Sequence, residues 1–120
     1  MKLPRNLEAV VPERKLTGYL LSETHSVGRT KAKFFRELGY GEENLIRLKE
    51  ALIAVAVTSD VTESISTPFG TKYVVDGELD APAGIRARVR TVWIIESGED
   101  LPRFVTAYPT GEEDRGAESD

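Results

Sequence analysis

The hydrophobic periodicity of the chain changes once, near residue 60, and this change constrains the fold more than any other feature. Before it, apolar residues recur at three-and-four spacing, which indicates helices facing a core; after it, stretches rich in valine, isoleucine, threonine and aromatics are separated by turn sequences. Helices followed by strands are typical of an α+β domain. We therefore predict about three N-terminal helices packed on one face of a C-terminal antiparallel β-meander of three to four strands.

Three helices are expected before the change. The first covers residues 12–21, where Pro12 suits a first helical turn. The second covers residues 28–38 and stops at the glycines of "GYG". The third, residues 42–55, has acids in its first turn, where they favour the helix dipole, and a leucine-rich stripe for the core.

The strands are expected at residues 71–80, 84–97 and 102–109, with a weaker one at 61–66. The turn sequences "DAPAG" and "SGEDL" separate the three stronger strands. Because residues 61–66 would form an exposed edge, they could pair between two chains, and a homodimer is one assembly that the sequence allows.

The net charge of −4 is unevenly placed, since residues 111–120 contribute all of it and residues 1–110 sum to zero. The sequence "GEEDRGAESD" has no aliphatic side chain larger than alanine, so it cannot bury enough surface to offset its ordering entropy. We predict a single α+β domain over residues 1–110 and a disordered acidic tail over residues 111–120.

The chain has no cysteine and one histidine, His25. Disulfides and thiolate metal sites are excluded, and a zinc site would need mostly carboxylate ligands, so we expect no metal and no cofactor. The N-terminus has no apolar run typical of a signal peptide, and no stretch approaches the ~20 apolar residues of a membrane span. We predict a cytoplasmic protein without membrane contact, and the methionine at position 1 favours a domain encoded alone.

The strand at 84–97 carries most of the chemistry, because alternation sorts its side chains between two faces. One face would pack on the helices and shows Ala87, Val89, Thr91, Trp93 and Ile95. The other face shows Arg86, Arg88, Arg90, Val92 and Ile94, so three arginines share it.

If the "DAPAG" turn pairs Leu79 with Ile85, then Glu78 lies opposite Arg86 and Asp76 opposite Arg88. Arg90 then lies opposite Val74 and has no carboxylate partner, which suits it to hold an anion bidentately. The alternative for Arg86 and Arg88 is an ordinary set of cross-strand ion pairs on an exposed face.

Two hydroxyl side chains, Thr106 and Tyr108, share a face of the last strand and can both donate hydrogen bonds. They are candidate positioning groups of a site, or they satisfy each other or a backbone carbonyl. The face that they share with the strand at 84–97 depends on a turn register that the sequence does not fix, since a slip of one residue exchanges the faces.

His25 lies just before a helix start that carries Arg29, Lys31 and Lys33. Cations together with the free N–H groups of a helix N-terminus attract anions. Beside a bound phosphate, a histidine can serve as a general acid or base at neutral pH. The alternative is a structural loop histidine, with Thr24 or Ser26 capping the helix.

Two blocks of the sequence, "HSVGRTKAKFFRELGY" and "GTKYVVDGELDAPAGIRARVRTVWIIESGEDLPRFVTAYP", resemble a bacterial family of small uncharacterised domains. In that family an H-P-V-G-R-x-K-A-x-F-F block precedes a V-R-T-V-W-I block and a V-T-A-Y-P ending. This chain departs from the pattern at Ser26, where the family has proline, and at Phe104, where it has leucine. The order of helices and meander also resembles the superfold of barnase, EndoU, colicin and RelE ribonucleases, many of which are toxins.

The second resemblance implies metal-independent cleavage of RNA, in which a 2′-hydroxyl attacks the adjacent phosphate and leaves a 2′,3′-cyclic phosphate. It implies His25 as general acid or base and Arg90, with Lys31 or Lys72, as stabilisers of the charged phosphorane. Thr106 and Tyr108 would donate hydrogen bonds or position the substrate. The residues expected to bind RNA are Arg29, Lys31, Lys72 and Arg88.

The RNA partner could be tRNA, mRNA or ribosome-bound RNA, and the protein partner a cognate antitoxin or immunity protein. An endoribonuclease is one interpretation of the sequence. The alternative is a non-catalytic module, such as an antitoxin, an immunity protein or another partner-binding domain, which fits the acidic pI near 5.1. A protein with neither activity is the third alternative. Convergence of His25, Arg90 and Thr106 or Tyr108 on one site would favour the enzyme.

Overall fold

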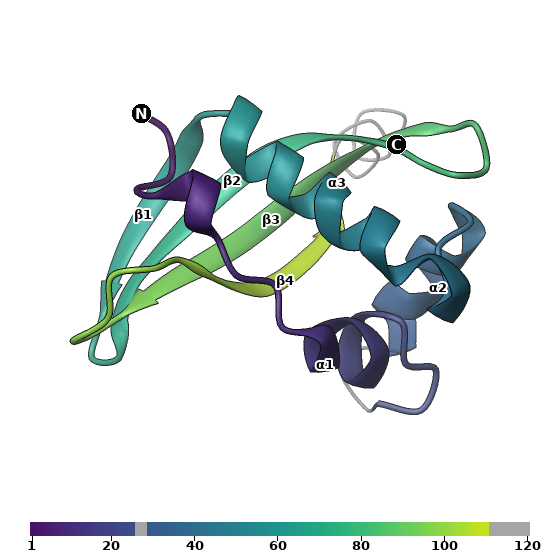
Figure 1. Ribbon diagram of the computed structural model, residues 1–120, viewed down its shortest axis with the longest axis horizontal. Helices are drawn as coiled ribbons and strands as arrows, with labels where there is room; N and C mark the ends of the chain where they lie inside the picture. Colours follow the sequence, from purple (N-terminus) through teal and green to yellow (C-terminus); the bar gives the residue numbers. More distant parts are fainter. Residues whose placement is uncertain (26–28, 111–120) are drawn as a thin grey trace, which may run out of the picture.

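The computed structural model describes residues 1–25 and 29–110, without the side chains of Arg29 and Thr30. Its β-sheet has four antiparallel strands in the order β1-β2-β3-β4. The strands are β1 (Val61–Thr67), β2 (Gly70–Asp80), β3 (Arg86–Glu96) and β4 (Arg103–Pro109). Sequential strands are neighbours throughout, so the sheet is the meander that the turn sequences predict (Figure 1).

The helical segments precede the strands. A 3-10 turn, η1 (Asn6–Glu8), is followed by α1 (Glu13–Lys15), which continues into a π-helical segment, η2 (Leu16–Leu20). Then come α2 (Arg29–Glu37), a second 3-10 turn, η3 (Glu42–Asn44), and α3 (Leu45–Thr58). The prediction of an α+β fold with N-terminal helices and a C-terminal antiparallel sheet is confirmed.

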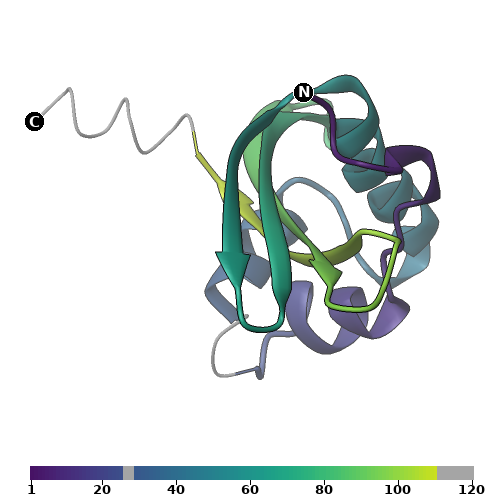
Figure 2. The ribbon, with the colours of Figure 1, turned by 90° about the vertical axis from the view of Figure 1, so that its left-hand side faces the viewer.

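The helix α3 lies across one face of the sheet, over β2 and β3, whereas α1, η2 and α2 lie near β4 (Figures 1 and 2). Close packing of α3 depends on Gly77 of β2, because a Cβ there would lie 2.9 Å from Cγ1 of Val55. Val10 forms a parallel bridge with Arg103 of β4, so the chain enters α1 beside the last strand.

The core contains Trp93 of β3, whose side chain is fully buried and packs edge-on against Phe104 of β4 at 5.5 Å. The indole N–H of Trp93 donates to the hydroxyl of Thr91 at 2.9 Å, and that hydroxyl donates to the carbonyl oxygen of Val75 at 2.7 Å. Buried polar groups need such partners. Trp93 belongs to the same core cluster as Leu48 and Leu52 of α3, which confirms the prediction that this face of the strand packs on the helices.

Two boundaries differ from the expected helices. The segment after Pro12 changes from α to π geometry at Leu16, and the third helix runs to Thr58 rather than residue 55. The helix continues through Val57 and Thr58, although β-branched residues are weak helix formers, and it ends at Ser59, which takes an extended conformation. The weaker strand at 61–66 is present as β1.

The expected register of β2 and β3 is wrong. Asp80 pairs with Arg86 and Leu79 with Ala87, so each residue of β2 has its partner two positions further along β3 than predicted. The connection closes after Asp80, where the N–H of Ala81 donates to the carbonyl oxygen of Ile85 at 2.9 Å and Gly84 takes φ +83°. A register shift of two residues leaves every side chain on the same face of the sheet but changes the residue that lies opposite it.

A β-bulge sets the direction of the side chains in β4. Phe104 pairs with Trp93, but Thr106, two positions later, pairs with Val92, because the register shifts between these pairs. Without the bulge, Phe104 and Thr106 would share a face; with it, Phe104 is buried in the core and Thr106 lies on the opposite face. Thr106 and Tyr108 therefore share the face of Arg90.

The predicted disordered tail, residues 111–120, and positions 26–28 lie outside the described residues. Within the parts that are described, no helix is long and apolar enough to cross a membrane.

Removal of a core side chain from α3 tests the packing. Leu52→Ala is expected to lower the free energy of unfolding by about 2–5 kcal/mol, because the side chain is fully buried and its loss leaves a cavity. Ile46→Ala on the same helix, where the side chain is 72% exposed, should change it by less than about 0.5 kcal/mol. Urea denaturation measures both, and equal effects would contradict the assigned face of α3.

Candidate functional site

The hydroxyl of Tyr19 joins three elements of the fold. Tyr19 belongs to η2, and its oxygen lies 2.9 Å from the hydroxyl of Thr106 on β4. The ammonium of Lys31, on α2, donates to the same oxygen at 2.8 Å. One phenol oxygen therefore links the π-helical segment, the second helix and the last strand, and it does so next to the sheet face that carries Arg90.

Lys31 is held between two aromatic rings. Its Nζ lies 5.3 Å from the ring centroid of Tyr19 and 6.0 Å from that of Tyr108, within the range of cation–π attraction. Lys15 lies over the Tyr19 ring at 5.2 Å as well. Across residues 1–25 and 29–110, neither lysine forms an ion pair with a carboxylate. The cluster thus holds two positive charges without carboxylate partners.

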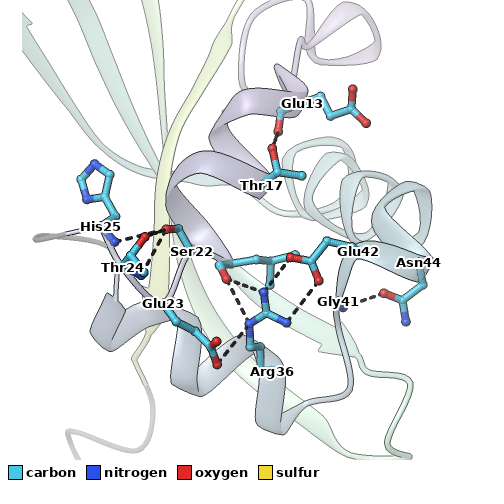
Figure 3. Close-up of polar contacts among 11 residues, drawn as sticks. Glu13, Thr17, Ser22, Glu23, Thr24, His25, Arg36, Gly41, Glu42 and Asn44 are labelled. Atoms are coloured by element: carbon cyan, nitrogen blue, oxygen red, sulfur yellow. Dashed lines mark hydrogen bonds and ion pairs between the residues drawn. The ribbon is translucent and has the colours of Figure 1, made fainter.

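His25 lies beside this cluster. Its ring meets the ring of Tyr19 edge-on, with 5.1 Å between the centroids. The preceding loop is fixed by the Ser22 hydroxyl, which accepts hydrogen bonds from the backbone N–H groups of Thr24, at 3.4 Å, and His25, at 3.1 Å (Figure 3). The sequence-predicted His25 and Lys31 therefore meet on the same tyrosine.

Arg36 of α2 anchors that loop from below. Its Nε and Nη2 donate to the carbonyl oxygen of Leu21 at 3.0 and 2.6 Å, and Nη2 also donates to Glu42 at 2.8 Å (Figure 3). The hydrogen bond to Glu42 and the nearby carboxylates raise the pKa of Arg36, although burial opposes them. In Figure 3 the His25 ring points away from Arg36, so Arg36 positions the loop and leaves the ring directed elsewhere.

The prediction that Arg90 has no carboxylate partner is wrong. Its Nε and Nη2 donate to the two carboxylate oxygens of Asp76 at 2.8 and 3.0 Å, because the register places Asp76, and not Val74, opposite it. The hydrogen bonds to Asp76, opposed by burial and aided by Tyr108, raise the pKa of Arg90. A guanidinium has five N–H donors, so the pair with Asp76 orients Arg90 and leaves donors for another acceptor.

Arg90 meets the cluster through Tyr108, which lies directly opposite it on β4. The four predicted catalytic residues therefore lie on connected contacts: His25 touches Tyr19, Tyr19 touches Thr106 and Lys31, Lys31 faces Tyr108, and Tyr108 adjoins Arg90. We call this group of side chains, completed by Lys15 and Asp76, the Tyr19 cluster.

The remaining predicted residues are not brought into the cluster. Lys72 lies on β2, opposite Ile94, and Arg88 lies on β3, opposite Glu78. Within the described part of the chain, neither has a hydrogen bond, ion pair or ring contact with the Tyr19 cluster. The side chain of Arg29, which was also predicted to bind RNA, lies outside the described part of the chain. The alternative interpretation of Arg86, a cross-strand ion pair, is confirmed by its 3.1 Å contact with Asp80.

Tyr19 itself is the residue that sequence reasoning missed. With Leu16 and Leu20 it forms an apolar three-and-four pattern, which indicates the core side of a helix. The π-helical geometry begins at Leu16 and leaves Tyr19 only partly buried, with its hydroxyl next to β4. The sequence did contain one signal for Tyr19: it is a tyrosine, with a polar hydroxyl, among leucines, and Lys15 precedes it by four positions.

The surroundings of Tyr19 alter its acidity. Burial acts to raise the pKa of the Tyr19 hydroxyl, but the hydrogen bonds with Lys31 and Thr106 and the charges of Lys31 and Lys15 outweigh it. The pKa of Tyr19 therefore lies below the usual value for a tyrosine. Among the residues that the structure places, no group of three or more histidines and carboxylates could hold a metal ion. The chemistry that this arrangement offers is anion binding, hydrogen-bond donation and proton transfer.

The chain belongs to the family described as a domain of unknown function, DUF6883, which matches residues 2–111. No curated protein matches the sequence. Among solved structures, a chain of a contact-dependent growth inhibition toxin–immunity protein complex from Klebsiella pneumoniae 342 is similar, with a TM-score of 0.69 and 17% identity. The similarity covers 88% of this chain and 97% of that one, and it shows a shared fold.

Inorganic phosphate is expected to stabilise the native protein, since a ligand that binds only the folded state raises the melting temperature. Lys31→Met should abolish the rise, because it removes the charge that Tyr19 holds in place. Lys33→Met, which removes an exposed charge from the same helix, should preserve it. Thermal melts with and without phosphate measure this, and an equal rise in Lys31→Met would contradict anion binding at the Tyr19 cluster.

Proposed function

We propose that this protein is a metal-independent ribonuclease of toxin type, which cleaves RNA by transesterification through the ribose 2′-hydroxyl. The observation that carries the proposal is the Tyr19 cluster. There a histidine, two lysines that form no ion pair within the described part of the chain, an oriented arginine and two hydroxyls from β4 adjoin one another. These are the groups that proton transfer and stabilisation of a charged phosphorane require.

The charges of the cluster support RNA as the substrate. Phosphate recognition depends on cations, and residues 1–110 have no net charge, so binding has to be local. Lys15 and Lys31 supply two positive charges, and Arg90 keeps free N–H donors while Asp76 fixes its plane. A bidentate guanidinium and a point-charge ammonium are complementary ways of holding phosphate oxygens.

Within the proposed mechanism, His25 transfers a proton to or from the reacting oxygens, and Lys31 and Arg90 stabilise the negative charge of the phosphorane. Tyr108 faces Lys31, Thr106 bonds Tyr19, and both hydroxyls help to position the substrate. The reaction needs an acid, a base and charge stabilisation. The products would be a 2′,3′-cyclic phosphate and a 5′-hydroxyl end.

The fold supports the toxin class. The chain of the Klebsiella complex that shares the fold comes from an assembly of a toxin with its immunity protein. By analogy of fold, a cognate immunity protein or antitoxin is the expected protein partner of this chain. Covering the Tyr19 cluster would be the direct way for such a partner to block activity.

The second candidate function is a non-catalytic module, an immunity protein or antitoxin. The observation that favours it is the overall acidity of the chain, with a net charge of −4, since inhibitors of ribonucleases often imitate the acidic surface of nucleic acid. The same fold similarity supports it, because the Klebsiella complex contains an immunity protein too. The two candidates differ in one result, cleavage of RNA.

Expression in a bacterium distinguishes them. Induction of the wild-type chain should arrest growth and produce new RNA fragments on a gel. His25→Ala should reduce cleavage by roughly 10²–10⁴-fold, because it removes a proton-transfer group. Arg90→Ala should likewise abolish the arrest, since Arg90 is proposed to bear part of the phosphorane charge.

The matched control is Arg47→Ala, which removes an exposed arginine from α3, away from the Tyr19 cluster, and should leave the arrest intact. Normal growth and intact RNA with the wild-type chain, at comparable amounts of soluble protein, would contradict the ribonuclease and favour the binding module. Cleavage that survives His25→Ala would remove histidine from the mechanism.

A further inference from the structure

The polar contacts of the cluster converge on one atom, the phenol oxygen of Tyr19. An ammonium can only donate, so this oxygen must accept the 2.8 Å hydrogen bond from Lys31. The hydroxyl of Thr106, at 2.9 Å, can donate or accept. If Tyr19 loses its proton, Thr106 can rotate to donate, and the phenolate then has two donors within the protein.

The charges that face Tyr19 are mostly positive. Lys15 of α1 and Lys31 of α2 lie within 5.3 Å of its ring centroid, and His25 meets the ring edge. From β4, Thr106 and Tyr108 contribute neutral hydroxyls. The carboxylate on this sheet face that lies nearest in register, Asp76, is engaged by Arg90 through both oxygens. A negative phenolate is therefore opposed by no free carboxylate among these groups.

The contacts of Tyr19 exceed what packing requires. A phenylalanine would fill the same space between Lys15 and His25, but it could neither accept from Lys31 nor bond Thr106. Tyrosine adds one titratable oxygen at the centre of a cluster rich in hydrogen-bond donors, whose carboxylate, Asp76, is already engaged by Arg90. An acceptor among donors is what a proton-transfer site needs to receive a proton.

We propose that Tyr19 is the general base of this site and that Lys31 stabilises its phenolate. The inference rests on the ribonuclease proposed above. The phenolate oxygen takes the proton of the ribose 2′-hydroxyl, and the 2′-oxygen forms a bond to phosphorus. The bond from phosphorus to the 5′-oxygen breaks, and that oxygen takes a proton from protonated His25. Solvent then removes the proton from Tyr19 and returns one to His25.

This assignment gives the roles of general base and general acid to two residues, Tyr19 and His25, where a single histidine would otherwise have to perform both. The acid and the base of an in-line displacement act on different oxygens, the leaving 5′-oxygen and the attacking 2′-oxygen. Tyr19 and His25 are adjacent, with ring centroids 5.1 Å apart, but they come from different positions, a π-helical segment and a loop. Each can therefore address a different oxygen of the same phosphodiester.

The first test needs no substrate. Absorbance near the phenolate band is followed against pH for the wild type, Tyr19→Phe, Lys31→Met and the control Tyr73→Phe. One of the four tyrosines should ionise at lower pH than the others in the wild type, and this transition should disappear in Tyr19→Phe and persist in Tyr73→Phe. Lys31→Met should move it to higher pH.

The second test uses RNA cleavage. Tyr19→Phe should lower the rate by roughly 10²–10⁴-fold, because it removes the proton acceptor while keeping the ring. Tyr73→Phe should retain the wild-type rate, since Tyr73 lies on the Trp93 face of β2. In Lys31→Met the alkaline limb of the pH–rate profile should shift in the same direction as the absorbance transition, and Lys31→Arg should shift neither.

The outcomes separate the two proposals. Absence of a low-pH phenolic transition, or one that Lys31→Met leaves in place, overturns the role of Tyr19 even if RNA is cleaved. Wild-type activity in a folded Tyr19→Phe variant overturns it as well. Failure of the wild type to cleave any RNA overturns both the ribonuclease proposal and the role of Tyr19 as its general base. The absorbance titration would still report whether Lys31 stabilises the phenolate of Tyr19.

Discussion

The burial of Trp93 on one face of β3 determines what the opposite face can do. Trp93 packs on Phe104, and its indole N–H is satisfied by Thr91, so the strand cannot rotate without exposing a large apolar side chain and breaking a buried hydrogen bond. Alternation then directs Arg90 to the other face. The bulge in β4 adds Thr106 to that face, and the π-helical segment carries Tyr19 to meet it.

Much of the fold could be predicted because it follows from periodicity. The change near residue 60 separated helices from strands, and alternation assigned the faces of β3 correctly. The partners of Arg90 could not be predicted, because they depend on whether the turn closes after Leu79 or after Asp80, and both closures keep the same faces. A difference of one residue in the turn decides whether Arg90 has a carboxylate partner.

The sequence named the outer members of the Tyr19 cluster but not its centre. The structure brings His25, Lys31, Arg90, Thr106 and Tyr108 into connected contacts, and their role as a site stays a prediction. Tyr19 was hidden, because its spacing with Leu16 and Leu20 reads as a core helix and only the π-helical geometry brings its hydroxyl to β4. The bulge that turns Thr106 outward was hidden as well, since there is no glycine or proline from Phe104 to Thr106, where the register shifts.

The most direct test of this account is the chemistry of RNA ends after incubation with the purified chain in excess chelator. The account predicts fragments that end in a 2′,3′-cyclic phosphate and begin with a 5′-hydroxyl, because the 2′-oxygen is the nucleophile and the reaction needs no metal. Intact RNA would contradict the ribonuclease, and fragments with a 3′-hydroxyl and a 5′-phosphate would contradict transesterification at the Tyr19 cluster.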